Sequence, residues 1–240
     1  MTEGYIMLKN EKTEIILSKD KYDFSDLCLI LEILRGEGGC PWDREQTHET
    51  IRKNFIEETY EVIEAIDNKD TELLREELGD VMLQVVFHAQ MEKELGNFDM
   101  DDVANDVCSK LVHRHPHIFG DINASTSEEV LSNWESIKNV EKSRETVYDK
   151  LVSVPAMMPA LMRSGKVAKK SGEYNEYSNS ELVCKIQSKV EEIGQEIKEI
   201  SSEQLGELLF LVSALSAKSG VDAEEALFKT TNQFIEKYKD

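Results

Sequence analysis

The stretch that decides the fold is Glu77 followed by LGDVMLQVVFHAQM, residues 78–91. Apolar side chains occur on almost every side of this segment, which predicts a helix that is largely buried. At the α-helical repeat its polar residues fall along one side; they are Glu77, Asp80, Gln84 and His88. An ionised carboxylate is very costly to bury alone. The polar stripe therefore predicts a functional site, with a metal ion, a cationic side chain or a fixed hydrogen-bond network as its partner.

A second set of acidic residues precedes this helix, in EETYE, residues 57–61. The apolar residues of the surrounding segment form one stripe, which predicts a packed helix face made of Ile51, Phe55, Thr59, Val62 and Ile66, with Ile63 at its edge. Glu58 borders this stripe and Glu61 lies just beyond it. Glu57 and Glu64 point the opposite way, toward water.

Two helices that each present two acids three residues apart can bring four carboxylates together. The four are Glu58, Glu61, Glu77 and Asp80. Hard oxygen ligands in that number suit Mg²⁺, or Mn²⁺, better than Zn²⁺, which prefers nitrogen and sulfur. The alternative is that the acids are simply solvated, and it is stronger for Glu58 and Glu61 than for the pair in the apolar helix.

Composition excludes several classes of partner. The 240 residues are 40% hydrophobic and 32% charged, which is typical of a globular protein. The net charge of −20 argues against duplex nucleic acid and against an anionic membrane, since both attract cationic surfaces. The four cysteines are far apart and form no CxxC motif, which predicts free thiols and a cytoplasmic location. No signal peptide and no membrane span is recognisable.

Few prolines and long amphipathic runs predict an all-α protein with two helical-bundle units in tandem. We expect a lead-in over residues 1–20, in which residues 5–19 are weakly strand-like or disordered. A first bundle follows over residues 21–124. Its helices are expected at 24–35, at 48–67, from 72 to about 95 with Thr71 as N-cap, and from an Asp99 cap to a stop before Pro116.

The second half repeats this pattern with altered residues. Residues 125–157 are interpreted as a linker with some helix, and Pro155 and Pro159 bracket a boundary. Residues 158–240 are expected to form a degenerate copy of the helical unit.

Two cations lie on the helix that ends before Pro116. Lys110 and Arg114 are four residues apart, close to the direction of Val107 and Leu111, which predicts that both face the packed side of the helix. An inward pair of cations is a natural partner for a phosphate chain. Two alternatives remain: the cations favour the helix dipole, or they pair with Glu77 or Asp80.

Trp42 lies in a loop ahead of the first acidic helix, within CPWD. Its indole is a candidate for stacking on a nucleobase. The competing interpretation is a packing anchor for the loop, which is the commoner role of such a tryptophan.

Four segments together carry a resemblance to a known family. They are CPWDREQTHETI, EETYEVIEAID, LREELGDVMLQVVFHAQM and KLVHRHPHIFGD. Their joint pattern over residues 24–120 resembles the MazG family of nucleoside triphosphate pyrophosphohydrolases. The resemblance implies an all-α, MazG-like fold that forms a homodimer and uses Mg²⁺ to hydrolyse nucleoside triphosphates to monophosphate and pyrophosphate.

The resemblance also implies roles for individual residues. The acid pairs of the family correspond to Glu58 with Glu61 and to Glu77 with Asp80, as metal ligands. Its phosphate-binding cations correspond to Lys110 and Arg114. These are the residues that the helical pattern selects independently.

The second half departs from the family pattern. Its corresponding positions read Glu192 with Gln195 and Gln204 with Glu207, and 8 residues separate the pairs instead of 15. Lys229 is retained, but Gln233 stands where a cation is expected. A shift of register could bring in Glu191, Glu196 or Glu203. We expect catalysis in the first half and a structural or regulatory role for the second.

The leading hypothesis is therefore an Mg²⁺-dependent pyrophosphohydrolase that cleans the nucleotide pool. The rival hypothesis is a non-catalytic module that binds nucleotide or metal and regulates a partner. A ferritin-like di-iron bundle is disfavoured, because neither acid pair is followed by histidine at the spacing that such a site requires.

Overall fold

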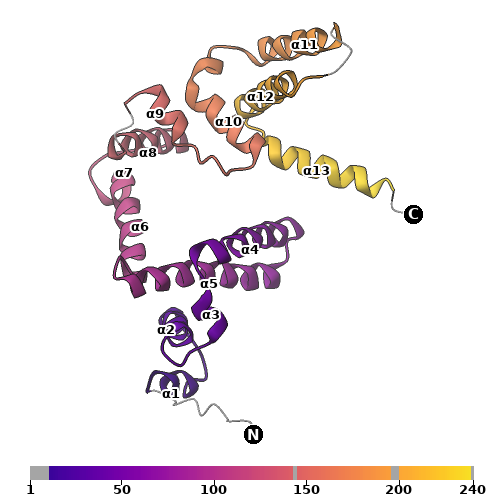
Figure 1. The fold of residues 1–240 in the computed structure, drawn as a ribbon. Coiled ribbons are helices and arrows are strands. Elements are labelled where there is room, and N and C mark those ends of the chain that lie inside the picture. Colours follow the sequence, from indigo (N-terminus) through magenta and orange to yellow (C-terminus); the bar gives the residue numbers. More distant parts are fainter. Residues whose placement is uncertain (1–10, 143–144, 196–199, 239–240) are drawn as a thin grey trace. The chain divides into compact units, whose positions relative to one another are not determined.

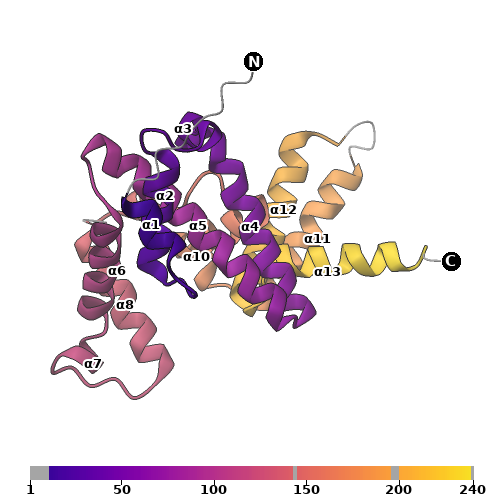
Figure 2. The same ribbon diagram turned by 90° about the horizontal axis from the view of Figure 1, so that it is seen from below.

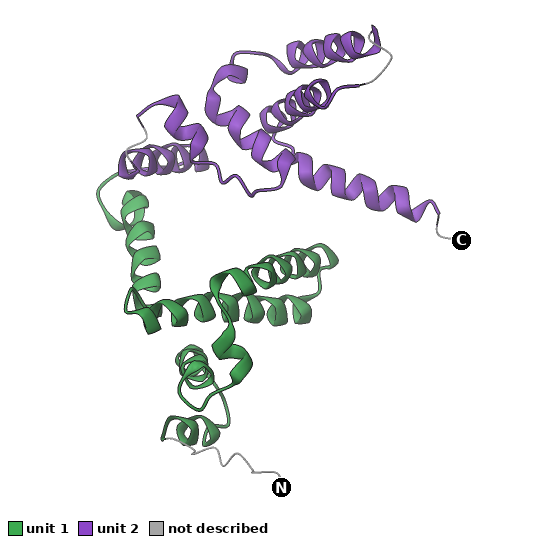
Figure 3. Ribbon diagram, in the orientation of Figure 1, with its two compact units in different colours: residues 1–122 green, residues 123–240 purple. Residues whose placement is uncertain are grey.

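The computed structural model describes residues 11–142, 145–195 and 200–238. Within these ranges the regular structure is entirely helical, which confirms the all-α prediction (Figure 1). None of the helices described is long and apolar enough to cross a membrane. The chain separates into two compact units, residues 1–122 and 123–240 (Figure 3).

The helices of unit 1 are α1 (Glu11–Leu17), α2 (Phe24–Arg35), α3 (Pro41–Glu45), α4 (His48–Asn68), α5 (Thr71–Leu95), α6 (Met100–Arg114) and α7 (Pro116–Phe119). Those of unit 2 are α8 (Ser127–Glu141), α9 (Val147–Val152), α10 (Ala160–Ser171), a 3₁₀ turn η1 (Glu173–Asn175), α11 (Asn179–Gln195), α12 (Ser202–Ser219) and α13 (Ala223–Glu236).

Unit 1 is organised around the α4–α5 pair. The two helices are joined by the Lys69–Asp70 turn, in which Lys69 adopts a left-handed conformation with φ of 56°. Helix α2 packs on α5, and the core is formed by Leu31, Ile51, Val86, Phe87 and Met91. The guanidinium of Arg35 donates two hydrogen bonds of 2.8 Å to the carboxylate of Glu94, which fixes the end of α2 to the end of α5.

The element boundaries follow the sequence closely, with two corrections. Residues 14–17, interpreted as weakly strand-like, lie in helix α1, while residues 1–10 lie outside the described residues. Helix α5 is capped by Asp70 and not by Thr71. The Asp70 side chain accepts hydrogen bonds from the backbone N–H groups of Glu72 and Leu73. Asp70 stands just outside the helix, where a side-chain oxygen can accept from the free N–H groups of the first turn, whereas Thr71 is already the first helical residue.

The predicted packing faces are only partly correct. In α4 the buried residues are Ile51 and Ala65, whereas Ile66 is 56% exposed. In α5 the buried face lies in the second half, and Leu78 and Met82 are 49% and 44% exposed. The helical repeat identifies an apolar face, but it does not say which part of that face the same chain covers.

Helix α6 shows the largest departure from the prediction. It begins as expected after an Asp99 cap, but Val107 and Leu111, its predicted packed face, are 47% and 50% exposed. It contacts α5 near the turn that joins them and then leaves the α4–α5 pair (Figures 1 and 2). Among the described residues of unit 1, α6 therefore does not close the bundle.

Unit 2 repeats the paired-helix arrangement. Helix α12 packs between α10 and α11, and its core includes Leu182 and Ala214, which are 0% and 2% exposed. The segment interpreted as a linker contains α8 and α9 and belongs to this unit. Helix α8 is linked to α10 by the ion pair between Glu135 and Lys170, at 2.7 Å.

Candidate metal site

Three carboxylates meet between α4 and α5. One oxygen each from Glu58, Glu77 and Asp80 lies within 4.8 Å of the others. The pairing of α4 with α5 through a short turn places the middle of α4 beside the first turns of α5. The three-residue spacing within each helix directs both members of an acid pair to one side. The helix pair thus brings together three of the four acids that the sequence selected.

The fourth acid, Glu61, lies at the exposed edge of this cluster. Its carboxylate is among the groups that raise the pKa values of Glu58 and Glu77. Glu61 therefore belongs to the same group of acids, at its solvent side.

Burial and mutual repulsion make this acid group unfavourable when it is fully ionised. Glu77 is only 7% exposed. Burial, then the neighbouring Asp80 and Glu61, raise the pKa of Glu58. Burial, then the hydrogen bond and charge of Glu61, raise the pKa of Glu77. The charged neighbours that raise both pKa values are all carboxylates, which is the environment that a divalent cation relieves.

The donor set fits a hard divalent cation. All of its candidate ligand atoms are carboxylate oxygens, the type that Mg²⁺ and Mn²⁺ prefer. One turn further along α5, the side-chain oxygen of Gln84 is buried without a hydrogen-bond partner. An unpartnered buried oxygen indicates a missing polar partner, such as a water molecule or an ion. The residues present thus match an oxygen-ligated metal centre.

The structure does not bring the two predicted cations to the acids of the same chain. Lys110 is exposed, contrary to the inward placement that the helical pattern predicted. Arg114 is 8% exposed, in agreement with that prediction. Both lie in α6, which starts beyond the far end of α5. Asp80 is 15 residues from that end, or roughly 22 Å along the helix.

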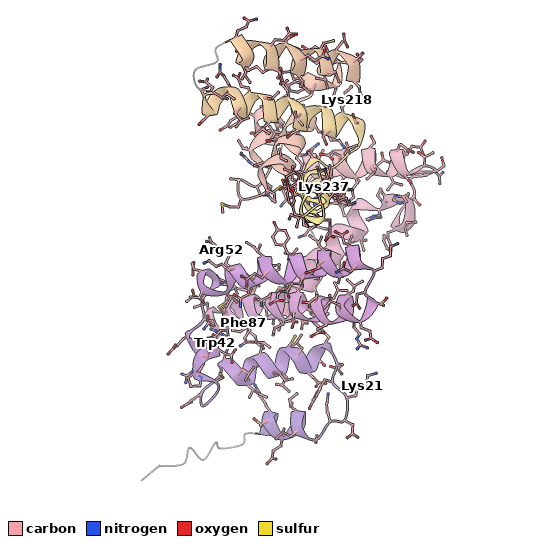
Figure 4. All side chains as sticks on the ribbon, turned by 90° about the vertical axis from the view of Figure 1, so that its right-hand side faces the viewer. Lys21, Trp42, Arg52, Phe87, Lys218 and Lys237 are labelled. Carbon is pink, nitrogen blue, oxygen red and sulfur yellow. The ribbon has the colours of Figure 1, made fainter. Side chains whose placement is uncertain are left out.

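Trp42 lies in the short helix α3, and its side chain is 57% exposed. The predicted loop is thus a short helix, and both interpretations of the indole, as a surface for base stacking and as a packing anchor, stay predictions. Figure 4 labels Trp42 and Phe87. The side chain of Phe87 belongs to the core and is only 5% exposed, in contrast to that of Trp42. The indole is accessible to a ligand or to another protein surface.

Unit 1 contains a histidine network that the sequence pattern did not predict. The Nδ1 atoms of His48 and His88 are 2.6 Å apart, and their rings stack with an interplanar angle of 2°. His48 Nε2 is 2.7 Å from a carboxylate oxygen of Glu92. This network ties the start of α4 to the second half of α5. His88 stood out as part of the polar stripe, but His48 gave no signal, because only the paired helices bring it there.

A groove of about 440 Å³ lies beside this network. Its lining is mostly apolar and includes Phe55, Ile56, Val85, Ala89, Phe98 and Val103. These residues come from α4, from α5, from the connection between α5 and α6, and from the start of α6. The groove extends the exposed apolar surface of the α4–α5 pair.

Comparison with known proteins identifies the family of the chain. A family model described as the MazG nucleotide pyrophosphohydrolase domain matches residues 46–119, which span the acid pairs and both cations. The chain is 39% identical over 223 residues to the nucleoside triphosphate pyrophosphohydrolase of Escherichia coli K12, which covers 89% of this chain and 85% of that protein.

A second relative extends the same agreement. The chain is 40% identical over 222 residues to the nucleoside triphosphate pyrophosphohydrolase/pyrophosphatase MazG of Thermotoga maritima, which covers 90% of this chain and 84% of that protein. Both similarities include the two units and not only the acid-bearing half. The chain therefore belongs to the MazG family of nucleotide pyrophosphohydrolases and is a hydrolase.

Proposed function

We propose that this protein hydrolyses nucleoside triphosphates to nucleoside monophosphate and pyrophosphate with Mg²⁺, and that it thereby cleans the nucleotide pool. The observation that carries the proposal is the convergence of Glu58, Glu77 and Asp80 within 4.8 Å in a chain of this family. Two relatives that share most of the chain are named as nucleoside triphosphate pyrophosphohydrolases.

In this proposal Glu58, Glu77 and Asp80 hold the metal ion, and Glu61 completes the set from its exposed edge. Mg²⁺, when bound, neutralises charge on the triphosphate and activates a water molecule for attack on the α-phosphorus. Mn²⁺ is the alternative ion, since it takes the same oxygen ligands. The raised pKa values of Glu58 and Glu77 support this assignment, because the acids need a cation to ionise together.

A carboxylate beside the metal would take the proton of the attacking water. Glu57 and Glu61 are the two candidates on α4. Glu61 raises the pKa values of both Glu58 and Glu77, and Glu57 raises that of Glu58. We therefore propose Glu61 for this role, with Glu57 at the solvent side.

Lys110 and Arg114 would bind phosphate oxygens and stabilise the charge that develops in the transition state. Within one chain, α6 leaves the acid-bearing helices, so we propose that a second copy of the chain completes the site. The exposed apolar residues of α4 and α5 support such a homodimer; they include Ile56, Tyr60, Ile63, Ile66, Leu78 and Met82. Trp42 is the exposed aromatic candidate for stacking on the base.

The direct test is release of pyrophosphate from a panel of ordinary, deoxy and modified nucleoside triphosphates, each with and without Mg²⁺. We expect pyrophosphate and monophosphate in equal amounts, and only with the metal. Release of inorganic phosphate instead would contradict the reaction type. Binding without turnover on every member of the panel would favour the rival, a non-catalytic regulatory module.

A further inference from the structure

Unit 2 contains a partly buried lysine between two acids that align with acids of the metal site. Lys189 of α11 has a side chain that is only 13% exposed. Its ammonium lies 2.8 Å from a carboxylate oxygen of Glu192 and 2.5 Å from one of Glu207. The first acid comes from the same helix and the second from α12. The lysine therefore joins the helix pair across its interface.

These two acids are the ones that the repeat retains. Glu192 corresponds to Glu58, and Glu207 corresponds to Asp80, when the acid pairs of the two halves are aligned. Each partner comes from a different helix, as in unit 1. The ammonium thus lies between the two helices, bonded to the two acids that align with Glu58 and Asp80.

The other two aligned positions hold amides, and the side chain of one of them is directed elsewhere. The side-chain oxygen of Gln204 accepts a hydrogen bond from the backbone N–H of Ser201, and the Ser201 hydroxyl accepts one from the backbone of Gln204. This capping box uses the Gln204 side chain to satisfy the start of α12. The amide is therefore turned toward its own helix terminus.

Among the described residues, the ion pairs of Lys189 are with Glu192 and Glu207, and neither of the register alternatives Glu191 and Glu203 is paired with it. The third register alternative, Glu196, lies outside the described residues. An ammonium carries one charge and three N–H donors, so it can bond two carboxylates at once without the octahedral oxygen shell that Mg²⁺ needs. Glu192 and Glu207 hold the pKa of Lys189 well above its usual range.

We propose that Lys189 takes the place of the metal ion in unit 2, as an internal cation that pairs the retained acids and makes this unit independent of divalent metal. The residue three positions before the first acid decides the difference. In unit 2 it is Lys189; in unit 1 the same position is Phe55, which lines the apolar groove. The inference rests on the proposed function only in comparing Lys189 with the metal ion proposed for unit 1. Its test concerns unit 2.

The experiment uses the full chain with the first site disabled by Glu58→Gln and Asp80→Asn, so that any metal response comes from unit 2. Three forms of this disabled chain are compared: one that keeps Lys189, one with Lys189→Met and one with Lys189→Arg. For each form we measure the melting temperature, and we measure Mn²⁺ binding from the electron paramagnetic resonance signal of the free ion. With Lys189 or arginine we expect no bound Mn²⁺ and no Mg²⁺-dependent shift.

For Lys189→Met without metal we expect the unfolding equilibrium constant of unit 2 to rise about tenfold. The effect is no larger because both acids are half exposed, so water screens their repulsion. Millimolar Mg²⁺ or Mn²⁺ should reverse much of that loss, because the two acids regain a cation. Adding Glu207→Gln to Lys189→Met should also restore stability, and should abolish the metal response.

Two results would overturn the inference. One is Mn²⁺ binding by unit 2 while Lys189 is intact. The other is a Lys189→Met variant that is destabilised but gains nothing from metal, which would make the contact an ordinary ion pair. If Lys189→Met does not fold, the Glu207→Gln combination and the arginine variant still decide between these outcomes. Because the first site is disabled throughout, a failure here is distinct from a failure of the proposed catalysis.

Discussion

The two halves of this protein each place acids between two paired helices and balance them differently. In unit 1, Glu58, Glu77 and Asp80 converge, and the charged neighbours that raise the pKa values of Glu58 and Glu77 are all carboxylates. In unit 2, Glu192 and Glu207 are bridged by Lys189. The comparison teaches that the charge left uncompensated in a fold, and not the fold itself, marks the place where a ligand is needed.

The largest expected effect separates the halves by activity. Asp80→Asn or Glu61→Gln should reduce the kcat for pyrophosphate release to less than a tenth, because each change removes one negative ligand or the proposed base. The matched change in unit 2, Glu207→Gln, should leave kcat unchanged. Steady-state kinetics at saturating Mg²⁺ measures both. An Asp80→Asn enzyme that retains more than a tenth of the wild-type kcat would contradict the assignment of Asp80 as a metal ligand.

The cations provide the second contrast. Lys110→Ala should lower kcat/KM by roughly a hundredfold, as expected for the loss of a group that stabilises transition-state charge, and Arg114→Ala should do the same. Neither should weaken Mg²⁺ binding. Lys229→Ala is the control, since the Lys229 ammonium bonds to Glu225 on its own helix. Should Lys110→Ala lose Mg²⁺ affinity as strongly as Asp80→Asn, the division between metal and phosphate ligands is wrong.

Metal binding should stabilise the halves unequally. A ligand that binds only the folded state adds about 2.7 kcal/mol at a concentration one hundred times its Kd. Saturating Mg²⁺ should therefore raise the melting temperature of the transition that belongs to unit 1, and Asp80→Asn should gain less. The transition of unit 2 should not move. Calorimetry with and without Mg²⁺ resolves the two, and an equal shift in both would remove the distinction.

The smallest effect is on the stability of the metal-free protein at different pH. The pKa values of Glu58 and Glu77 are raised in the folded state, so these groups favour folding at low pH and lose that contribution as pH rises through the folded pKa. Without metal, Glu58→Gln should therefore melt a few degrees higher than the wild type near neutral pH. The gain should vanish as pH falls toward the ordinary value of 4.5 for glutamate.

Glu192→Gln in unit 2 is the matched control for this pH series. It removes an acid that is already paired with Lys189, so it should give no gain at neutral pH. Melting curves of both variants in the absence of divalent ions provide the comparison. A rise in melting temperature for Glu192→Gln as large as that for Glu58→Gln would show that the whole acidic chain, and not the converging acids, causes the effect.

Local sequence was enough to determine the helices and the acids. The apolar run of residues 78–91 predicted α5, the Asp99 cap and Pro116 predicted the limits of α6, and the i, i+3 spacing selected Glu58, Glu77 and Asp80. These features depend on neighbours within one or two turns, which the helical repeat relates directly.

Only the tertiary structure decided how these helices meet. It left Val107 and Leu111 exposed, separated Lys110 from the acids, joined His48 to His88, and placed Lys189 between Glu192 and Glu207. Each of these results depends on contacts between separate helices. The helical repeat fixes the direction of a side chain around its own axis, but it carries no information about which helix, or which copy of the chain, lies in that direction.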